Sequence, residues 1–190
     1  EDTGWRAVER DGVRRVERCE CWHETVTAQL LVDARVPPRY VRCTLDNFVL
    51  YPNEKLIAVL THAKRFVEPF PAVQKGLCLI APPGIGKTHI AVAVLKDIIR
   101  SKHVRGLFYD VRDLLRVIRS TYNPVVRTAE MDILRPVMDA DLLVHDDLGA
   151  EKPSEWVEET MNLIVNTHYN HKRATIFTTN YPFEDPDPAS

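Results

Sequence analysis

Residues 77–89, with the sequence LCLIAPPGIGKTH, have the types and spacing that phosphate binding requires. An apolar run leads into a loop in which Gly84 and Gly86 let the backbone bend and approach a ligand closely. A helix that follows directly adds free N–H groups and the positive end of its dipole. The members of the expected phosphate loop are Pro83, Gly84, Ile85, Gly86, Lys87, Thr88 and His89.

Lys87 and Thr88 give this loop its chemistry. The lysine can reach the β- and γ-phosphates of a nucleotide, and the threonine hydroxyl can hold Mg²⁺. The pattern G-x-x-x-x-G-K-[ST] is matched except at its first glycine, which is Ala81 here. This departure costs about 1–2 kcal/mol only if the position needs a left-handed backbone. The competing interpretation is an ordinary strand, turn and helix with a surface lysine.

Two adjacent carboxylates, Asp146 and Asp147, come at the end of a second apolar run. Neighbouring acids repel each other unless a cation lies beside them, and Mg²⁺ held by Thr88 and Asp146 would supply that cation. Taken alone the pair would fit an acidic turn better, but the phosphate loop upstream favours the metal site. Asn180 follows a further strand of the same sheet and could orient an attacking water.

The elements that must position these residues alternate between strands and helices. Strands are expected at residues 77–81, 107–109, 142–146 and 174–178, with helices at 87–102, 111–122 and 128–139 among the connections. This order predicts an α/β fold, a three-layer αβα sandwich with a parallel sheet. The motifs then lie at the carboxyl ends of strands, where such sheets bind ligands. His145 replaces an aliphatic residue in its strand, so we expect it to face a polar neighbour.

The first 24 residues form a small unit of their own. Two short strands, 5–8 and 13–16, flank Asp11-Gly12, a strong signal for a two-residue hairpin turn. Cys19 and Cys21 follow, and in an extended chain they point to the same face. They form either half of a Zn²⁺ site, with His23 as a further candidate, or two surface cysteines. A Pro-rich breaker places the domain boundary between residues 1–36 and 37–190.

The expected helix 111–122 carries Arg112, Arg116 and Arg119 along one side. Three arginines in one stripe could follow a nucleic-acid phosphate backbone, and a solvated helix face explains them equally well. The formal net charge of −2 means that any such binding must use a local patch. Arginines also concentrate in the N-terminal unit, where interspersed acids favour a solvated face.

Composition limits the class of protein. The hydrophobic content of 45% and the charged content of 27% are ordinary globular values. No run reaches the apolar length of a membrane span, and no signal peptide is visible. Four cysteines without a framework spacing indicate a reducing compartment rather than a disulfide scaffold, so we expect a cytoplasmic protein with no membrane partner.

Four motifs in order, TLDNF, PPGIGKTH, VHDDLG and FTTNYP, resemble the AAA+ ATPases of the DnaC/DnaI helicase-loader type and the related IstB transposition helpers. The resemblance covers residues 37–182 and implies a P-loop NTPase of the AAA+ (ASCE) kind that binds ATP and Mg²⁺. It implies that Phe48 packs the adenine, that Asp147 takes the place of a catalytic glutamate and that Asn180 is the sensor asparagine. The N-terminal cysteine hairpin resembles the zinc-binding region of such loaders, without its preceding cysteine pair.

The resemblance also implies binding partners and a limited rate of ATP hydrolysis. Helices 111–122 and 128–139 occupy the insertion that faces single-stranded DNA in loaders and initiators. The arginine finger and the C-terminal lid are expected after residue 190, so hydrolysis by these 190 residues should be weak. We expect a switch that loads a replicative helicase onto single-stranded DNA and self-associates through its nucleotide interface. The alternatives are an IstB-like transposition helper that binds duplex DNA, or a nucleotide-binding adaptor with little hydrolysis.

Overall fold

In the computed structural model, which describes residues 4–51, 53–73, 75–122 and 129–182, four parallel strands form the central sheet. In spatial order the strands are β3 (Leu77–Ile80), β6 (Ala174–Thr179), β5 (Leu142–Leu148) and β4 (Gly106–Asp110). All four predicted strands are therefore present, and their pairing is parallel throughout. The carboxyl ends of the strands meet along one edge of the sheet, as the α/β prediction requires.

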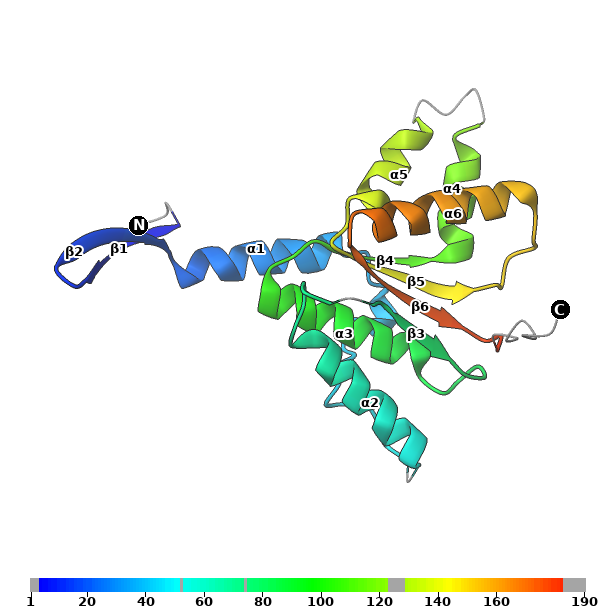
Figure 1. Cartoon of the computed structure of the whole chain (residues 1–190), viewed down its shortest axis with the longest axis horizontal. Helices are drawn as coiled ribbons and strands as arrows, with labels where there is room; N and C mark the ends of the chain where they lie inside the picture. The colour runs from blue at the N-terminus through cyan, green and yellow to red at the C-terminus, as the bar shows by residue number, and fades with distance from the viewer. Residues whose placement is uncertain (1–3, 52, 74, 123–128, 183–190) are drawn as a thin grey trace.

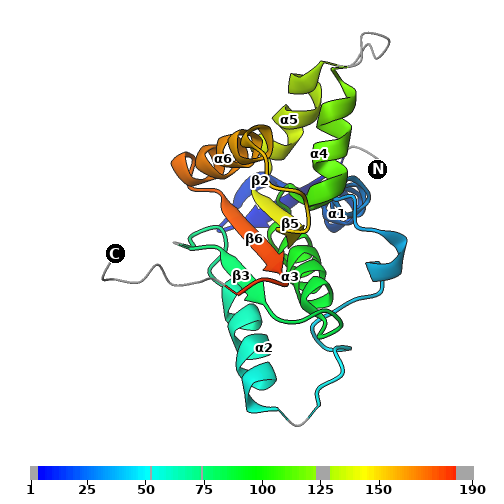
Figure 2. The same ribbon diagram turned by 90° about the vertical axis from the view of Figure 1, so that its right-hand side faces the viewer.

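Helices cover both faces of this sheet (Figures 1 and 2). One layer contains α2 (Glu54–Val67) and α3 (Lys87–Lys102), and the other contains α4 (Val111–Ser120), α5 (Glu130–Met138) and α6 (Glu155–Asn170). A hydrophobic core lies on each face of the sheet, and alternate residues of β5 contribute to them in turn. Leu142 and Val144 belong to the core on the α3 side, and Leu143 belongs to the core on the side of α4–α6. The predicted three-layer αβα sandwich is confirmed.

The helix after the phosphate loop, α3, lies deepest in the fold. Nine of its residues are buried, because the run IAVAVL packs between the sheet and α2. The burial includes Lys96, whose ammonium group donates to the carbonyl oxygens of Val41 and Cys43. These contacts tie the segment before α2 to α3, next to the short 3₁₀ helix Pro38–Tyr40.

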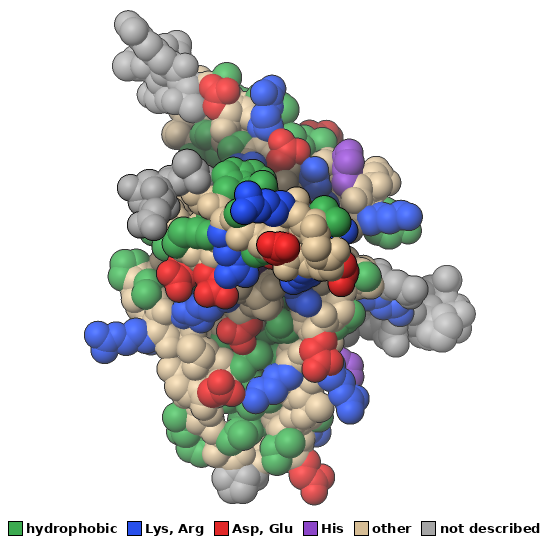
Figure 3. Space-filling view, turned by 90° about the vertical axis from the view of Figure 1, so that its left-hand side faces the viewer, with side chains coloured by type: hydrophobic (Ala, Val, Ile, Leu, Met, Phe, Trp, Pro, Cys, Tyr) green, Lys and Arg blue, Asp and Glu red, His purple; other side chains and the backbone are tan. Residues whose placement is uncertain are grey.

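The N-terminal hairpin stands away from the sheet at the far end of α1 (Glu20–Asp33), as Figure 1 shows. Its strands are β1 (Trp5–Arg10) and β2 (Val13–Arg18). The predicted turn is confirmed, since Asp11 and Gly12 have φ values of 55° and 71°, which a two-residue hairpin turn of this kind needs. Figure 3 shows basic and acidic side chains interspersed over the face seen from this end, rather than one basic patch.

The opposite end of α1 joins the hairpin unit to the sheet. Ala34 is fully buried, and its carbonyl oxygen accepts a hydrogen bond of 2.8 Å from the amide of Phe108 in β4. The helix begins at Glu20, directly after Cys19. Among the helices in the described part of the chain, none has the length and apolar composition needed to cross a bilayer.

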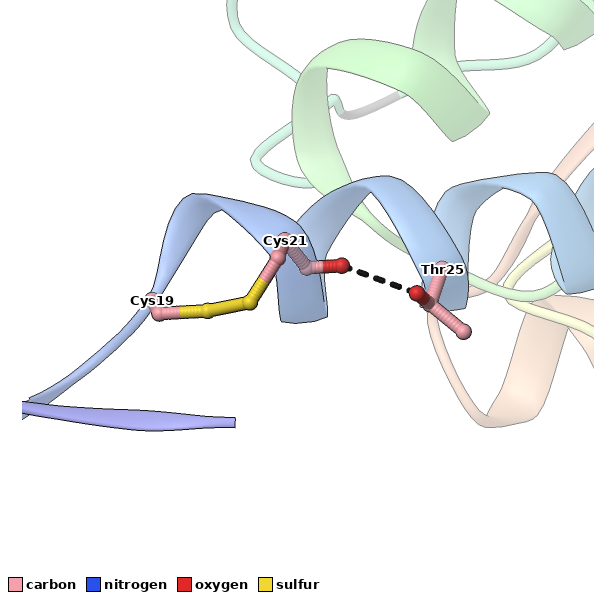
Figure 4. The surroundings of a disulfide bond; sticks show 3 residues. All are labelled: Cys19, Cys21 and Thr25. Atoms are coloured by element: carbon pink, nitrogen blue, oxygen red, sulfur yellow. Dashed lines mark hydrogen bonds between the residues drawn. A yellow bond between two sulfur atoms is a disulfide. The ribbon is translucent and has the colours of Figure 1, made fainter. Parts of the chain in front are cut away.

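The two N-terminal cysteines differ from their prediction. Cys19 precedes the first residue of α1 and Cys21 lies in its first turn, so this segment is not the extended chain assumed above. The two sulfur atoms are joined in a disulfide (Figure 4). Zinc binds the thiolate form of cysteine, which a disulfide does not provide. The prediction that Cys19 and Cys21 are Zn²⁺ ligands is therefore wrong for this structure.

His145 also differs from its prediction. The side chain is fully buried, and its ring stacks on Phe177 with 5.5 Å between centroids and 8° between planes. Both ring nitrogens lack a hydrogen-bond partner among the described residues. Burial, assisted by the neighbouring His168, lowers the pKa of His145 to about 3. The expected polar neighbour is thus an aromatic ring, and the imidazole is neutral.

Candidate nucleotide-binding site

The phosphate loop depends on two glycines with left-handed backbones. Gly84 and Gly86 have φ values of 84° and 97°. Space for a side chain at Gly84 is open, with no heavy atom within 4 Å of an added Cβ. Ala81 lies outside the left-handed region, so alanine at the first position of the motif carries no backbone strain. The departure from the motif has no conformational cost here.

Phe48 lies against the end of this loop. A Cβ added to Gly86 would come within 2.6 Å of the Phe48 ring, so only glycine allows the ring to lie this close. The ring also meets His89 edge to face, with 5.1 Å between centroids. His89 is fixed in turn, because its Nε2 shares a 2.9 Å hydrogen bond with the carbonyl oxygen of Thr44. The fold therefore brings Phe48 to the loop, although this residue lies 38 positions before Gly86 in the sequence.

Lys87 reaches back over the loop. Its ammonium group donates to the carbonyl oxygens of Ala81 and Pro82 at 2.7 and 3.0 Å, and to Oδ1 of Asn180 at 2.7 Å. An ammonium group has three donors, and these three acceptors use all of them. Phosphate oxygens could replace these acceptors, because they offer the same geometry with added negative charge.

Thr88 and Asp146 face each other across the carboxyl edge of the sheet. The threonine hydroxyl lies 2.9 and 3.1 Å from the two carboxylate oxygens. The Thr178 hydroxyl donates to Asp146 Oδ1 at 2.6 Å. Burial raises the pKa of Asp146, and the hydrogen bonds from Thr178 and Thr88 act in the opposite direction. A hydroxyl beside a largely buried carboxylate is a donor set that fits Mg²⁺, which prefers hard oxygen ligands.

Asp147 is held through both its backbone and its side chain. Its φ of 60° is unusual for a residue with a side chain, and its amide donates to Thr178 Oγ1 at 2.9 Å. Asn180 Nδ2 donates to Oδ1 of the Asp147 carboxylate at 2.6 Å. Arg112 Nη2 donates to Oδ2 at 3.2 Å. The predicted pair Asp147 and Asn180 is therefore brought into direct contact.

The three arginines on α4 lie in three different environments. Arg112 contacts Asp147, as described above. Arg116 pairs with Asp113 at 3.2 Å on the open surface, and its side chain is 79% exposed. The Arg119 guanidinium lies over the Trp156 ring, 4.7 Å from its centroid. The part of the stripe that faces solvent is thus smaller than the sequence suggests, and nucleic-acid binding by these residues stays a prediction.

Sequence reasoning missed two contributors to the site. Thr178 links the backbone of Asp147 to the carboxylate of Asp146, and its only sequence signal is a hydroxyl near the end of a buried strand. The contact of Arg112 with Asp147 spans 35 positions, and the helical periodicity that placed the arginine on a stripe carries no sign of it.

A parallel sheet with a glycine-rich loop and its lysine, a threonine in contact with an aspartate, and an asparagine at the end of a neighbouring strand is typical of an ATP-binding P-loop protein of the AAA+ fold. Residues 54–188 match the family described as IstB-like ATP binding protein, and the chain belongs to that family. The resemblance to DnaC-type AAA+ ATPases related to IstB is thereby confirmed.

Particular relatives agree with this assignment. The replicative helicase loader DnaC of Escherichia coli (strain K12) is 28% identical over 151 residues, which cover 79% of this chain and 60% of that protein. The crystal structure of the DnaC helicase loader superposes with a TM-score of 0.69 at 35% identity, covering 78% of this chain and 82% of that one. A crystal structure of DnaI gives a TM-score of 0.66 at 24% identity, covering 78% and 77%. The chain therefore spans about 60% of the length of the E. coli relative.

Proposed function

We propose that this chain is the Mg-ATP-binding part of a replicative helicase loader, in which ATP controls binding to the helicase and to single-stranded DNA. The observation that carries the proposal is the contact between Thr88 and Asp146 beside the phosphate loop that holds Lys87, in a chain similar to DnaC. The helicase as partner rests on the name of the E. coli relative, a replicative helicase loader.

In this proposal each residue has a defined task. Lys87 exchanges its carbonyl and amide acceptors for the β- and γ-phosphates. Thr88 and Asp146 hold Mg²⁺, which when bound neutralises charge on the phosphates. Asp147 accepts a hydrogen bond from the attacking water, and Asn180 keeps the carboxylate aligned through its 2.6 Å contact. Phe48 packs against the adenine at the base of the loop.

Slow hydrolysis is part of the proposal. Asp147 is one methylene shorter than glutamate, so its carboxylate reaches less far toward a water in line with the γ-phosphate. ATP binding, rather than rapid turnover, would then set the affinity for DNA and helicase. Neighbouring copies would meet at the bound nucleotide, which is the self-association expected of this type of ATPase.

Nucleotide-dependent capture of the helicase tests the proposal. The full-length protein is immobilised and incubated with the replicative helicase of its own host, with ATP, with ADP or without nucleotide. We expect retention with ATP that is lost in the Lys87→Ala variant and kept in Lys55→Ala, an exposed lysine of α2. Retention that is identical in all three nucleotide conditions, or unaffected by Lys87→Ala, would contradict the proposal.

A transposition helper is the second candidate, and the family match to IstB-like proteins is the observation that favours it. In that case the protein would bind duplex DNA in preference to single strands and would retain a transposase instead of a helicase. Competition between a single-stranded and a duplex oligonucleotide of the same sequence, with Mg-ATP present, separates the two candidates. A preference for the duplex supports the helper.

A further inference from the structure

Lys96 is a charged residue in an otherwise apolar buried stretch of α3. It is 5% exposed, and the buried residues around it in the helix, which include Leu95, Ile98 and Ile99, are hydrophobic. Burial lowers the pKa of Lys96, because the charged ammonium group loses solvation there. Packing alone would favour an apolar side chain at this position, so the lysine must be explained by the groups that it binds.

The ammonium group of Lys96 binds the backbone of a segment that lies before α2. It donates to the carbonyl oxygens of Val41 and Cys43, and the second of these hydrogen bonds is 2.7 Å long. Cys43 and Leu45 are themselves buried in the core on the α3 side. The segment is therefore held to α3 both by polar contacts of its backbone and by apolar contacts of its side chains.

His89 makes a similar contact two helical turns earlier on α3. Its Nε2 lies 2.9 Å from the carbonyl oxygen of Thr44. Because a carbonyl oxygen can only accept a hydrogen bond, Nε2 is the nitrogen that carries the hydrogen. His89 and Lys96 are seven positions apart, so they lie on the same face of the helix. This face of α3 thus holds three carbonyl oxygens of residues 41–44.

A hydrogen-bonded turn connects these contacts to Phe48. The amide of Thr44 donates to Asn47 Oδ1 at 2.9 Å, and the amide of Asn47 donates to Thr44 Oγ1 at 3.1 Å. Nδ2 of Asn47 donates to the carbonyl oxygen of Arg42 at 2.7 Å. Phe48 follows directly, and its ring lies against the phosphate loop. The place of the ring is therefore set by a turn that is anchored to α3.

We propose that Lys96 is a positioning residue that holds Phe48 in a fixed place relative to the phosphate loop, so that loop and ring bind one nucleotide together. The inference rests on the proposed function, in which Phe48 packs against the adenine. The first two residues of α3 are Lys87 and Thr88, so one helix sets both the phosphate end and the base end of the site. Loss of the ammonium group should weaken the contribution of the base to binding and leave that of the phosphates unchanged.

The affinities of the full chain for ATP and for inorganic triphosphate test this inference, because only ATP has a base. Isothermal titration in Mg²⁺ gives both Kd values. Lys96→Met keeps the apolar stem of the side chain and loses the ammonium group. We expect it to weaken ATP binding about five- to tenfold, the loss that follows when part of the base–aromatic stacking is removed. The Kd for inorganic triphosphate should stay within about twofold of the wild-type value.

A matched control and a second variant separate this role from a merely structural one. Lys102 lies on the same helix and donates to the carbonyl oxygen of Glu68 at 2.8 Å, so Lys102→Met removes a similar contact to another segment and should leave both affinities unchanged. Asn47→Ala opens the turn from an exposed position and should reproduce the selective loss even if Lys96→Met does not fold. In a Phe48→Ala background, Lys96→Met should not change the ratio of the two affinities further.

An equal loss for ATP and inorganic triphosphate in Lys96→Met would overturn the inference, because the lysine would then only stabilise the fold. Unchanged affinity for both ligands would overturn it too, as would the same selective loss in Lys102→Met or its absence in Asn47→Ala. Equal Kd values for the two ligands in the wild type would refute the inference while phosphate binding stands. If the wild type binds neither ligand, the proposed function fails and the inference fails with it.

Discussion

The hydroxyl of Thr88 lies 2.9 Å from one carboxylate oxygen of Asp146 and 3.1 Å from the other, although the residues are 58 positions apart. This relationship joins the start of α3 to the end of β5 and turns two separate sequence signals into one site. A hydroxyl and a carboxylate in contact are the protein ligands that a nucleotide-bound Mg²⁺ uses.

Replacing Thr88 by valine should remove the benefit of Mg²⁺ for nucleotide binding. Valine keeps the shape of the side chain but lacks the hydroxyl that faces Asp146. We expect the affinity of the variant for ATP in Mg²⁺ to equal its affinity in EDTA, whereas the wild type binds more tightly in Mg²⁺. Isothermal titration under both conditions measures this. Thr61→Val, at an exposed threonine of α2, is the control, and an undiminished Mg²⁺ effect in Thr88→Val would remove the metal assignment.

Replacing Lys87 by alanine should weaken ATP binding about tenfold or more, the loss expected for charge-assisted hydrogen bonds to phosphate. The structure predicts little loss of folding stability, because the acceptors of Lys87 are exposed or partly buried carbonyl and amide groups that water can reach. Fluorescence titration with a labelled ATP measures the affinity, and thermal unfolding measures stability. Equal affinity in the variant and the wild type would show that the loop does not bind the triphosphate.

The two loop glycines should respond differently to alanine. Both substitutions place a side chain in a left-handed backbone, at a cost of about 1–2 kcal/mol. Only at Gly86 does the new Cβ also meet Phe48, at 2.6 Å, so Gly86→Ala should destabilise the fold more than Gly84→Ala. Urea unfolding gives the two free energies. Adding Phe48→Ala should reduce the difference between them; a difference that persists would mean that the ring contact is not its cause.

Replacing His145 by leucine should stabilise the protein by about 1–3 kcal/mol, because two buried nitrogens without partners are removed. The pH dependence has a defined sign. With the folded-state pKa at about 3 and an ordinary value of 6.5, the unfolded chain binds a proton between these values and the folded chain does not. Wild-type stability therefore falls as the pH drops below 6.5, by about 1 kcal/mol between pH 7.5 and 5.5 for this residue.

Urea unfolding of the wild type and His145→Leu at both pH values tests this assignment. The variant should lose about 1 kcal/mol less than the wild type on acidification. His168 remains in both proteins, and burial lowers its pKa as well, so its contribution largely cancels in the comparison. Parallel losses in the two proteins would indicate that His145 can accept a proton in the folded state.

Arg116 should contribute more to single-stranded DNA binding than its neighbours on α4. Its side chain is 79% exposed, whereas Arg112 contacts Asp147 and Arg119 stacks on Trp156. Arg116→Ala should weaken binding of a single-stranded oligonucleotide and reduce the slope of log K against log salt by about 0.7, the value for one phosphate contact. Fluorescence anisotropy at several salt concentrations measures both. An effect no larger than that of Arg65→Ala, on the opposite layer, would assign Arg116 to a solvated face.

Much of this site could be read from the sequence, because its signals are local. The bounds of helix 87–102 agree with α3 to the residue, and the four strands lie within a few residues of their predicted ends. The left-handed turn at Asp11-Gly12 needed only two adjacent residues. Hydrophobic periodicity and turn preferences depend on residues a few positions apart, so they can be recognised in a single sequence without knowledge of the tertiary structure.

Other features depend on contacts that no local pattern contains. The sequence by itself determined the phosphate loop, the acidic strand end and the alternation of strands and helices. Only the tertiary structure decided that Cys19 and Cys21 pair, that His145 stacks on Phe177 and that Arg112 contacts Asp147. The physical reason is that these contacts follow from strand register and from how a helix lies over the sheet edge, and both are fixed by packing of the whole core.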